Sequence, residues 1–149
     1  TRINNEEVLV FPPILDSKQL NTIYLYKNNK STPEKISKDL STVLEEDGIK
    51  ITFIKCGSDS KIIQEREQWT DGANAFALSP GKIIGYDCNN HTIDELKKAG
   101  YSAITSEEYI NNYNHFNETD EKFIITIKGS ELSRGRGGPR CLTLPLFRL

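Results

Sequence analysis

The residues best suited to chemistry lie near the end of the chain, in the segment Glu131–Cys141, which holds three arginines and three glycines before a single cysteine. Glycines let a backbone adopt positive φ and approach a ligand closely, and nearby guanidinium groups favour the thiolate form of a cysteine. The segment therefore predicts that Cys141 is a nucleophile. The residues alone leave a second interpretation equally open, in which Cys141 is a small inert cysteine in a buried strand.

Two other functions fit a glycine-arginine segment less well. Segments of this kind that bind RNA usually occur as repeats, and this one occurs once. A phosphate cradle of the P-loop type needs a lysine followed by a serine or threonine after the glycines, and these are absent here. Both functions are disfavoured relative to a nucleophilic cysteine.

The elements that would position Cys141 begin with a module of alternating strands and a helix. Val8–Phe11 and Thr22–Tyr26 are rich in β-branched and aromatic residues and are predicted to be strands. Ser31–Glu34 then supplies a cap, a proline and an early acidic residue, which predict a helix that ends at Gly48. Four apolar residues follow this cap at helical spacing: Ile36, Leu40, Val43 and Leu44. Ile49–Ile54 is predicted to be a third strand.

A similar order recurs in the second half of the chain. Ala75–Leu78 and Ile83–Tyr86 are predicted strands, followed by a helix capped by Thr92 and a strand at Ser102–Thr105. The polar stretch Ser106–Glu121 is predicted to be a short helix or surface loop outside the core. A last apolar run, Leu142–Leu146, is predicted to be a buried strand. The pattern as a whole predicts an α+β fold with mixed sheets.

Composition limits the classes of function. A net charge of −2 argues against bulk attraction to nucleic acid, and no apolar run approaches the roughly 20 residues that cross a bilayer. Three cysteines without short paired spacing disfavour a disulfide framework and a zinc site. We therefore expect reduced thiols in a cytoplasmic protein, with no cofactor, metal, nucleic acid or membrane as a partner.

Two segments together give a specific resemblance. Glu131–Cys141 resembles the catalytic cysteine signature of arginine deiminases, and Glu65–Asn74 is similar to a second block of the same family. The resemblance covers about residues 1–149 and implies that they form the last part of a longer enzyme. Two positions depart from the family pattern, because Cys88 stands where an arginine is usual and Leu142 where a methionine is usual.

The resemblance implies a fold and a reaction. The fold would be a five-bladed α/β propeller of the pentein type, of which this chain supplies about two strand-strand-helix-strand blades. The first module would cover about residues 1–60 and the second about 61–149, with a polar insertion at about 106–121. The reaction would hydrolyse L-arginine to L-citrulline and ammonia through a covalent thiouronium on Cys141, with Arg136 and Gly135 binding the substrate.

The same resemblance implies that other groups are needed. A cationic substrate would be repelled by the loop arginines, so catalysis requires carboxylates and a histidine to move protons. The family takes these from a His-x-Asp element, which neither His91 nor His115 matches, and both histidines are expected at the surface. We therefore expect the chain alone to be inactive, to need an amino-terminal portion of the enzyme as a partner, and to form a homo-oligomer.

Two alternatives stay open at this point. The chain could be a non-catalytic interaction or regulatory module with the same fold, or a guanidine-modifying enzyme similar to an amidinotransferase. Within the block Glu65–Asn74, Trp69 is interpreted as an aromatic anchor and Asn74 as a turn or capping residue.

Overall fold

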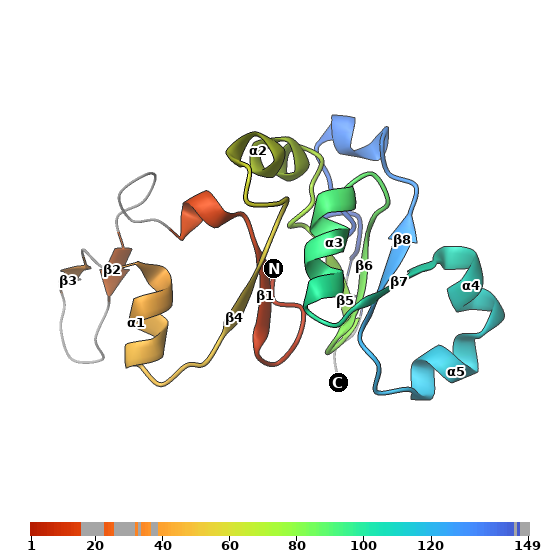
Figure 1. The fold of residues 1–149 in the computed structure, drawn as a ribbon, viewed down its shortest axis with the longest axis horizontal. Coiled ribbons are helices and arrows are strands. Elements are labelled where there is room, and N and C mark those ends of the chain that lie inside the picture. Colours follow the sequence, from red (N-terminus) through yellow and green to blue (C-terminus); the bar gives the residue numbers. More distant parts are fainter. Residues whose placement is uncertain (16–22, 26–31, 33, 37–38, 145, 147–149) are drawn as a thin grey trace.

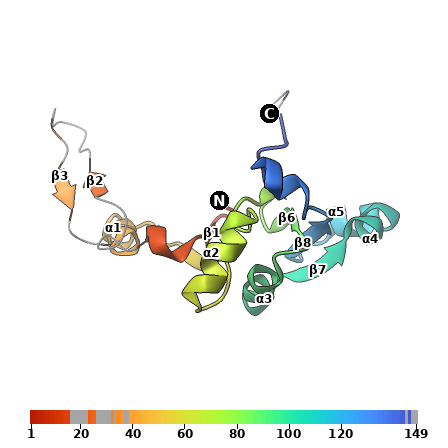
Figure 2. The same ribbon diagram turned by 90° about the horizontal axis from the view of Figure 1, so that it is seen from above.

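The computed structural model describes residues 1–15, 23–25, 32, 34–36, 39–144 and 146, and these form mixed helices and sheets. The predicted α+β class is confirmed. The elements spread along one long axis, with β2, β3 and α1 at one end and α4 and α5 at the other (Figure 1). The view from above places β1 and β4 between these ends, next to a four-stranded sheet (Figure 2).

The first part of the chain contains two small sheets. β1 (Glu7–Val10) pairs in parallel with β4 (Thr52–Lys55), and the short 3₁₀ helix η1 (Pro12–Ile14) follows β1 directly. β2 (Ile23–Leu25) pairs in antiparallel fashion with β3 (Glu34–Ile36). The strands predicted at the positions of β1 and β4 are confirmed. The second predicted strand, Thr22–Tyr26, is confirmed at residues 23–25, and its two ends lie outside the described residues.

The predicted helix of the first module is only half correct. α1 covers Leu40–Glu46, and Gly48 follows two residues later with a φ of +76°, which suits a glycine after a helix. Its start was predicted too early, because residues 34–36 form β3. There the strand ladder pairs Ile36 with Ile23, so the backbone is satisfied by a neighbour and not by a helical turn. The cap residues 31 and 33 lie outside the described residues.

The second part of the chain is built on a sheet with the order β5-β6-β8-β7. β5 (Phe76–Ser79) is antiparallel to β6 (Lys82–Tyr86), whereas β8 (Phe123–Ile127) runs parallel to both β6 and β7 (Ser102–Thr105). The three predicted strands of this part are confirmed. The central strand β8 was not predicted, although its run of Phe, Ile and Thr is typical of a buried strand.

The polar stretch after β7 forms two short helices, α4 (Ser106–Asn111) and α5 (Tyr113–Glu118). α4 begins with a capping box, in which Thr105 accepts a hydrogen bond from the backbone N–H of Glu108 and the Glu108 carboxylate accepts one from that of Thr105. Neither helix contains a buried residue, which confirms the prediction that the stretch lies outside the core.

One apolar core joins the two parts of the chain. Its buried members come from β1, β4, the segment before β5, β6, α3, β8 and the adjoining turns: Ile3, Leu9, Ile54, Ala75, Ile83, Ile93, Leu96, Tyr101 and Ile124. A polar contact strengthens this junction at the rim. The Glu7 carboxylate of β1 accepts hydrogen bonds from Lys122 Nζ at 2.7 Å and from the Tyr101 hydroxyl at 2.8 Å. Within the part of the chain that the structure describes, no helix combines the length and apolar character that crossing a membrane requires.

Two helices flank the junction and are linked by one carboxylate. α2 covers Lys61–Trp69 and α3 covers Asn90–Lys98. Glu67 of α2, only 4% exposed, accepts hydrogen bonds from the backbone N–H groups of His91 and Thr92 at 2.9 and 2.7 Å, and from the Thr92 hydroxyl at 2.6 Å. The prediction that Thr92 caps α3 is therefore wrong. The first turn of α3 is satisfied by an acid from another helix, which also suits the positive end of the helix dipole.

Replacing Glu67 with alanine should lower the free energy of unfolding by about 2–4 kcal/mol, because three buried donors lose a charged acceptor. Urea denaturation followed by circular dichroism measures this change. Glu65→Ala is the matched control, since Glu65 is exposed on the same helix, and it should change the free energy of unfolding by less than about 0.5 kcal/mol. Equal effects of the two substitutions would contradict the role of the carboxylate.

Candidate active site

The turn after α2 holds the first half of the candidate site. Asp71 has a φ of +59°, a left-handed conformation that Asp tolerates better than most residues. The next residue, Gly72, donates its N–H to the Glu67 carbonyl at 2.7 Å, and a Cβ there would lie 2.8 Å from Cys56 Sγ. Only glycine therefore fits. The turn closes with a hydrogen bond from Asn74 N–H to the Asp71 carbonyl at 2.9 Å, which confirms Asn74 as a turn residue.

The loop after β8 holds the second half. It begins at Gly129, where a Cβ would lie 1.9 Å from the Tyr86 ring, and continues through the 3₁₀ helix η2 (Leu132–Gly135). The buried Tyr86 hydroxyl donates a hydrogen bond to the Gly137 carbonyl at 2.7 Å. The loop therefore wraps around one tyrosine of β6, and Gly129 is needed where the backbone contacts the ring.

The two halves meet at Cys141. Asn74 Nδ2 lies 2.9 Å from Cys141 Sγ, a contact between residues 67 positions apart. A Cβ on Gly138 would lie 2.5 Å from Asn74 Cβ and Cγ, so the loop backbone also packs directly against Asn74. Cys141 is exposed and opens into a hollow of about 500 Å³, lined by Thr1, Gln68, Asp71, Ala73, Asn74, Arg140 and Cys141.

The strand predicted after Cys141 is absent. Leu142 and Thr143 donate their backbone N–H groups back to Gly138 and Arg140, which makes a turn in place of a strand. The side chains of Leu142, Leu144 and Leu146 are 59%, 80% and 89% exposed. The prediction of a buried strand is wrong, and so is the interpretation of Cys141 as an inert buried cysteine. An apolar run becomes a buried strand only where a partner strand is present to cover it.

The predicted substrate-binding residues lie away from this hollow. Arg136 adopts a φ of +63° and stacks its guanidinium carbon 4.2 Å from the centre of the Trp69 ring. Gly135 is exposed, with no atom within 4 Å of the position a Cβ would take. The ring of Trp69, which the sequence analysis interpreted as an aromatic anchor, is 63% exposed. The arginine that lines the hollow with Cys141 is Arg140.

The two histidines lie outside the lining of this hollow, whereas one carboxylate belongs to it. His91 and His115 are exposed, as predicted, and neither lines the hollow at Cys141. The carboxylate that does line it belongs to Asp71, whose Oδ2 is buried without a hydrogen-bond partner. Among the described residues, no group of three or more His, Cys, Asp or Glu side chains is arranged to hold a metal ion.

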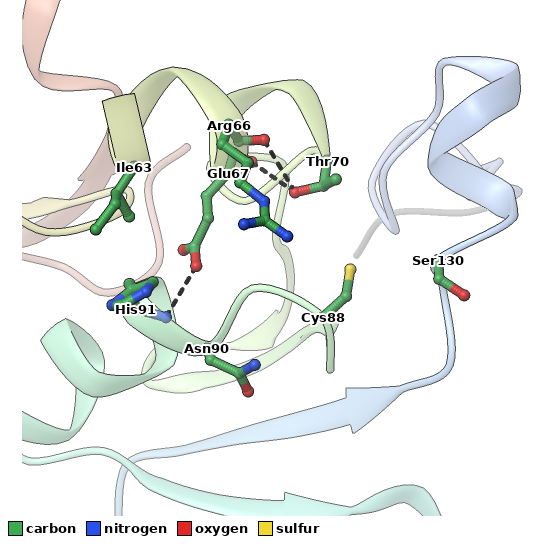
Figure 3. A pocket seen from close by; sticks show the side chains of 8 residues that line it. All are labelled: Ile63, Arg66, Glu67, Thr70, Cys88, Asn90, His91 and Ser130. Atoms are coloured by element: carbon green, nitrogen blue, oxygen red, sulfur yellow. Dashed lines mark hydrogen bonds between the residues drawn. The ribbon is translucent and has the colours of Figure 1, made fainter. Parts of the chain in front are cut away.

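The other two cysteines have different surroundings from Cys141. Burial raises the pKa of the Cys56 thiol to about 11, and burial also raises the pKa of the Cys88 thiol. Cys88 lines a separate hollow of about 320 Å³ between α2, the start of α3 and the loop at Ser130 (Figure 3). Arg66 and His91 also reach this hollow, which contains neither Cys141 nor Asn74.

Sequence reasoning missed the chemical role available to Asn74 and Asp71. Their block was recognised as similar to a family signature, but Asn74 was interpreted as a turn or capping residue and no chemical role was assigned to Asp71. The block itself could have indicated a chemical role. Its turn is polar and has no apolar face, so packing in a core does not explain why these residue types match a family signature. The contact between Asn74 and Cys141 joins residues 67 positions apart, and no local sequence pattern reveals such a contact.

Tyr86→Phe should loosen the loop, since the Gly137 carbonyl loses its buried donor at a cost of about 1–3 kcal/mol. Cleavage by trypsin after Arg136 and Arg140 should become about tenfold faster, because the loop opens more often. Tyr113→Phe is the control, as Tyr113 is 52% exposed on α5. An unchanged cleavage rate in Tyr86→Phe would contradict the role of the hydroxyl.

Arg136→Ala should uncover the Trp69 ring, which belongs to the single tryptophan of the chain. Its emission should move to longer wavelength and become more sensitive to quenching by acrylamide, although the lost contact contributes only about 0.5–1 kcal/mol. Arg134→Ala serves as the matched control, because Arg134 pairs with Glu131 at 3.1 Å and does not stack on the ring. The same emission from both variants would show that the stacking does not occur in solution.

Comparison with known proteins identifies the family of the chain. The sequence model of the family described as arginine deiminase matches residues 1–148. Arginine deiminases of Mycoplasma capricolum subsp. capricolum and Listeria monocytogenes serotype 4b (strain CLIP80459) are 36% and 37% identical to the chain over 149 and 151 residues. An arginine deiminase of Oenococcus oeni is 34% identical over 152 residues.

Each of these alignments covers 99% of this chain and 31%, 32% and 32% of the respective relative. The chain therefore spans about a third of the length of the curated relatives that it matches. Since the family model extends over almost every residue, the chain belongs to the arginine deiminase family.

Proposed function

We propose that this chain supplies the nucleophile of an arginine deiminase, which converts L-arginine to L-citrulline and ammonia. In this mechanism the Cys141 thiolate attacks the guanidinium carbon and ammonia leaves, which gives a covalent thiouronium. Water then adds to that carbon, citrulline departs and the thiolate returns. The names of the relatives support the reaction, and the assignment of its nucleophile to Cys141 is our inference.

The contact between Asn74 and Cys141 is the observation that carries this proposal. It brings the two family-like blocks to one point although they are far apart in sequence. Of the three cysteines, Cys141 is the one that is exposed, and it opens beside polar side chains into a hollow. A scaffold without catalysis would have no need to hold a thiol in this position.

Arg136 and Gly135 are proposed to bind the carboxylate of the substrate after a movement of the loop. The stacking of Arg136 on Trp69 is worth about 0.5–1 kcal/mol at an exposed site. Hydrogen bonds between a guanidinium and a carboxylate contribute about 1.5–3 kcal/mol each, and the planar guanidinium can make two of them. An arriving carboxylate can therefore draw Arg136 from the ring.

Residues outside this chain are proposed to complete the site. The hollow at Cys141 contains Arg140, which repels a substrate guanidinium, and it contains no histidine to move protons. The chain also spans only about a third of its relatives. Both facts support our expectation that acids and an imidazole come from a preceding portion of the enzyme, and that the chain alone does not turn over arginine.

The same incompleteness bears on architecture. We propose that residues 1–60 and 61–149 correspond to about two blades of a five-bladed propeller of the pentein type, operating in the reducing cytoplasm. The exposed Leu142, Leu144 and Leu146 support this, because apolar side chains in a row are normally covered by a neighbour. Either the rest of the enzyme or a second copy of the chain would provide that cover.

A chimera tests the proposed reaction. Residues 1–149 would replace the aligned segment of the Mycoplasma capricolum relative, and citrulline would be measured with arginine as substrate. We expect the chimera to be active and Cys141→Ser in it to lose activity by at least about 10³-fold. Cys88→Ser in the same chimera is the matched control and should keep the activity. Citrulline formation by the isolated chain, or by the Cys141→Ser chimera, would overturn the proposal.

A further inference from the structure

The side chains beside Cys141 contain two buried oxygen atoms without a partner. These are Asp71 Oδ2 and Asn74 Oδ1, and they are the buried side-chain nitrogen or oxygen atoms without a hydrogen bond among the described residues. Leaving a buried polar atom unpaired costs about 1–3 kcal/mol. Neighbouring interactions that favour this orientation of the two side chains must offset the cost of the unpaired oxygens.

The contacts of the Asn74 amide nitrogen explain why Asn74 Oδ1 is left unpaired. Nδ2 donates to Cys141 Sγ at 2.9 Å and also lies 3.4 Å from Asp71 Oδ1. With the amide turned over, Oδ1 would face both the carboxylate and the sulfur, and each of these is an acceptor when ionised. The carboxylate of Asp71 therefore selects the orientation in which nitrogen faces sulfur, even though Asn74 Oδ1 is left unpaired.

The backbone around this pair is held in place on two sides. Asp71 sits in a left-handed turn fixed by Gly72, which packs against Cys56 and the Glu67 carbonyl. Gly138 packs directly against the Asn74 side chain, since a Cβ at this glycine would lie 2.5 Å from Asn74 Cγ. The amide therefore has little freedom to move away from the sulfur. What remains free is a flip of the amide group, which exchanges the positions of Oδ1 and Nδ2.

We propose that Asn74 stabilises the Cys141 thiolate by donating its amide N–H to the sulfur, and that Asp71 fixes the end of the amide that faces it. Asn74 is then a catalytic residue, because it touches the reacting atom, and Asp71 is a positioning residue. The inference rests on the proposed role of Cys141 as the nucleophile.

The charged and titratable groups around the sulfur define the alternative. Asp71 lies beside it in the turn after α2, Arg140 in the loop, and Tyr86 in β6. A hydrogen bond to the charged form of a group favours that form, whereas a nearby like charge disfavours it. If Asp71 acted only through its charge, it would oppose the thiolate, so the two explanations predict opposite signs.

Alkylation by iodoacetamide, a small neutral reagent, measures the thiolate directly in the isolated chain. Rates would be followed from pH 5 to pH 10, with the modified cysteine identified by peptide mass. Asn74→Asp replaces the donor with an acceptor of the same shape. We expect its Cys141 to react about tenfold more slowly at pH 7.5 and to reach half of its limiting rate about one pH unit higher, the equivalent of about 1.4 kcal/mol.

Two controls accompany Asn74→Asp. Asn114→Asp adds the same charge on the exposed surface of α5 and should leave the Cys141 rate unchanged. Cys88 in each variant reports any general loosening of the fold, and its rate should not follow that of Cys141. Should Asn74→Asp fail to fold by circular dichroism, Asn74→Ala takes its place, with a smaller expected reduction of about threefold to tenfold.

Asp71→Asn separates positioning from charge. The new amide can either donate or accept, so it no longer selects the orientation of Asn74, and we expect slower alkylation of Cys141 than in the unmodified chain. Faster alkylation would overturn the positioning role, since it would mean that the carboxylate acts through its charge. An unchanged rate in Asn74→Asp or its replacement Asn74→Ala would overturn the role of Asn74. Either result leaves the proposed function intact as long as the chimera still requires Cys141.

Discussion

The position of the candidate site depends on the carboxylate of Glu67. It binds the first turn of α3 through His91 and Thr92, and its own backbone carbonyl receives the N–H of Gly72. One residue therefore joins the two helices and also fixes the turn that begins the site. Because the carboxylate is almost fully buried, water does not compete for its acceptor sites, and these charge-assisted hydrogen bonds keep much of their strength.

A second constraint brings the far end of the chain to this turn. The loop after β8 closes around Tyr86, and both the missing side chain at Gly129 and the hydrogen bond to Gly137 are needed for that closure. Cys141 then arrives next to Asn74 with its sulfur exposed. The glycine-rich composition, first interpreted as freedom to approach a ligand, serves here to let the backbone approach an aromatic ring and an amide.

The sequence predicted those parts of the fold that are set by local interactions. Strands with β-branched residues were found, and Gly48 correctly marked the end of a helix because its backbone is left-handed. The start of that helix was wrong, since residues 34–36 pair with a strand that local spacing does not reveal. The buried strand expected at Leu142–Leu146 failed for the related reason that an apolar run has no fixed structure without a partner. Cys141 was proposed as the nucleophile from its sequence neighbours, whereas its contact with Asn74 could be seen only in the packed structure.

The strand order has a consequence for how the molecule reaches its native state. β6 and β7 do not touch as neighbours, because β8 lies between them and pairs with both. The sheet cannot be completed until residues 123–127 have been synthesised and inserted between two strands that precede them. Such non-local pairing slows folding. The loop that contains Cys141 follows immediately after the inserted strand. During biosynthesis Cys141 should therefore reach its contact with Asn74 only after β8 has been inserted between β6 and β7.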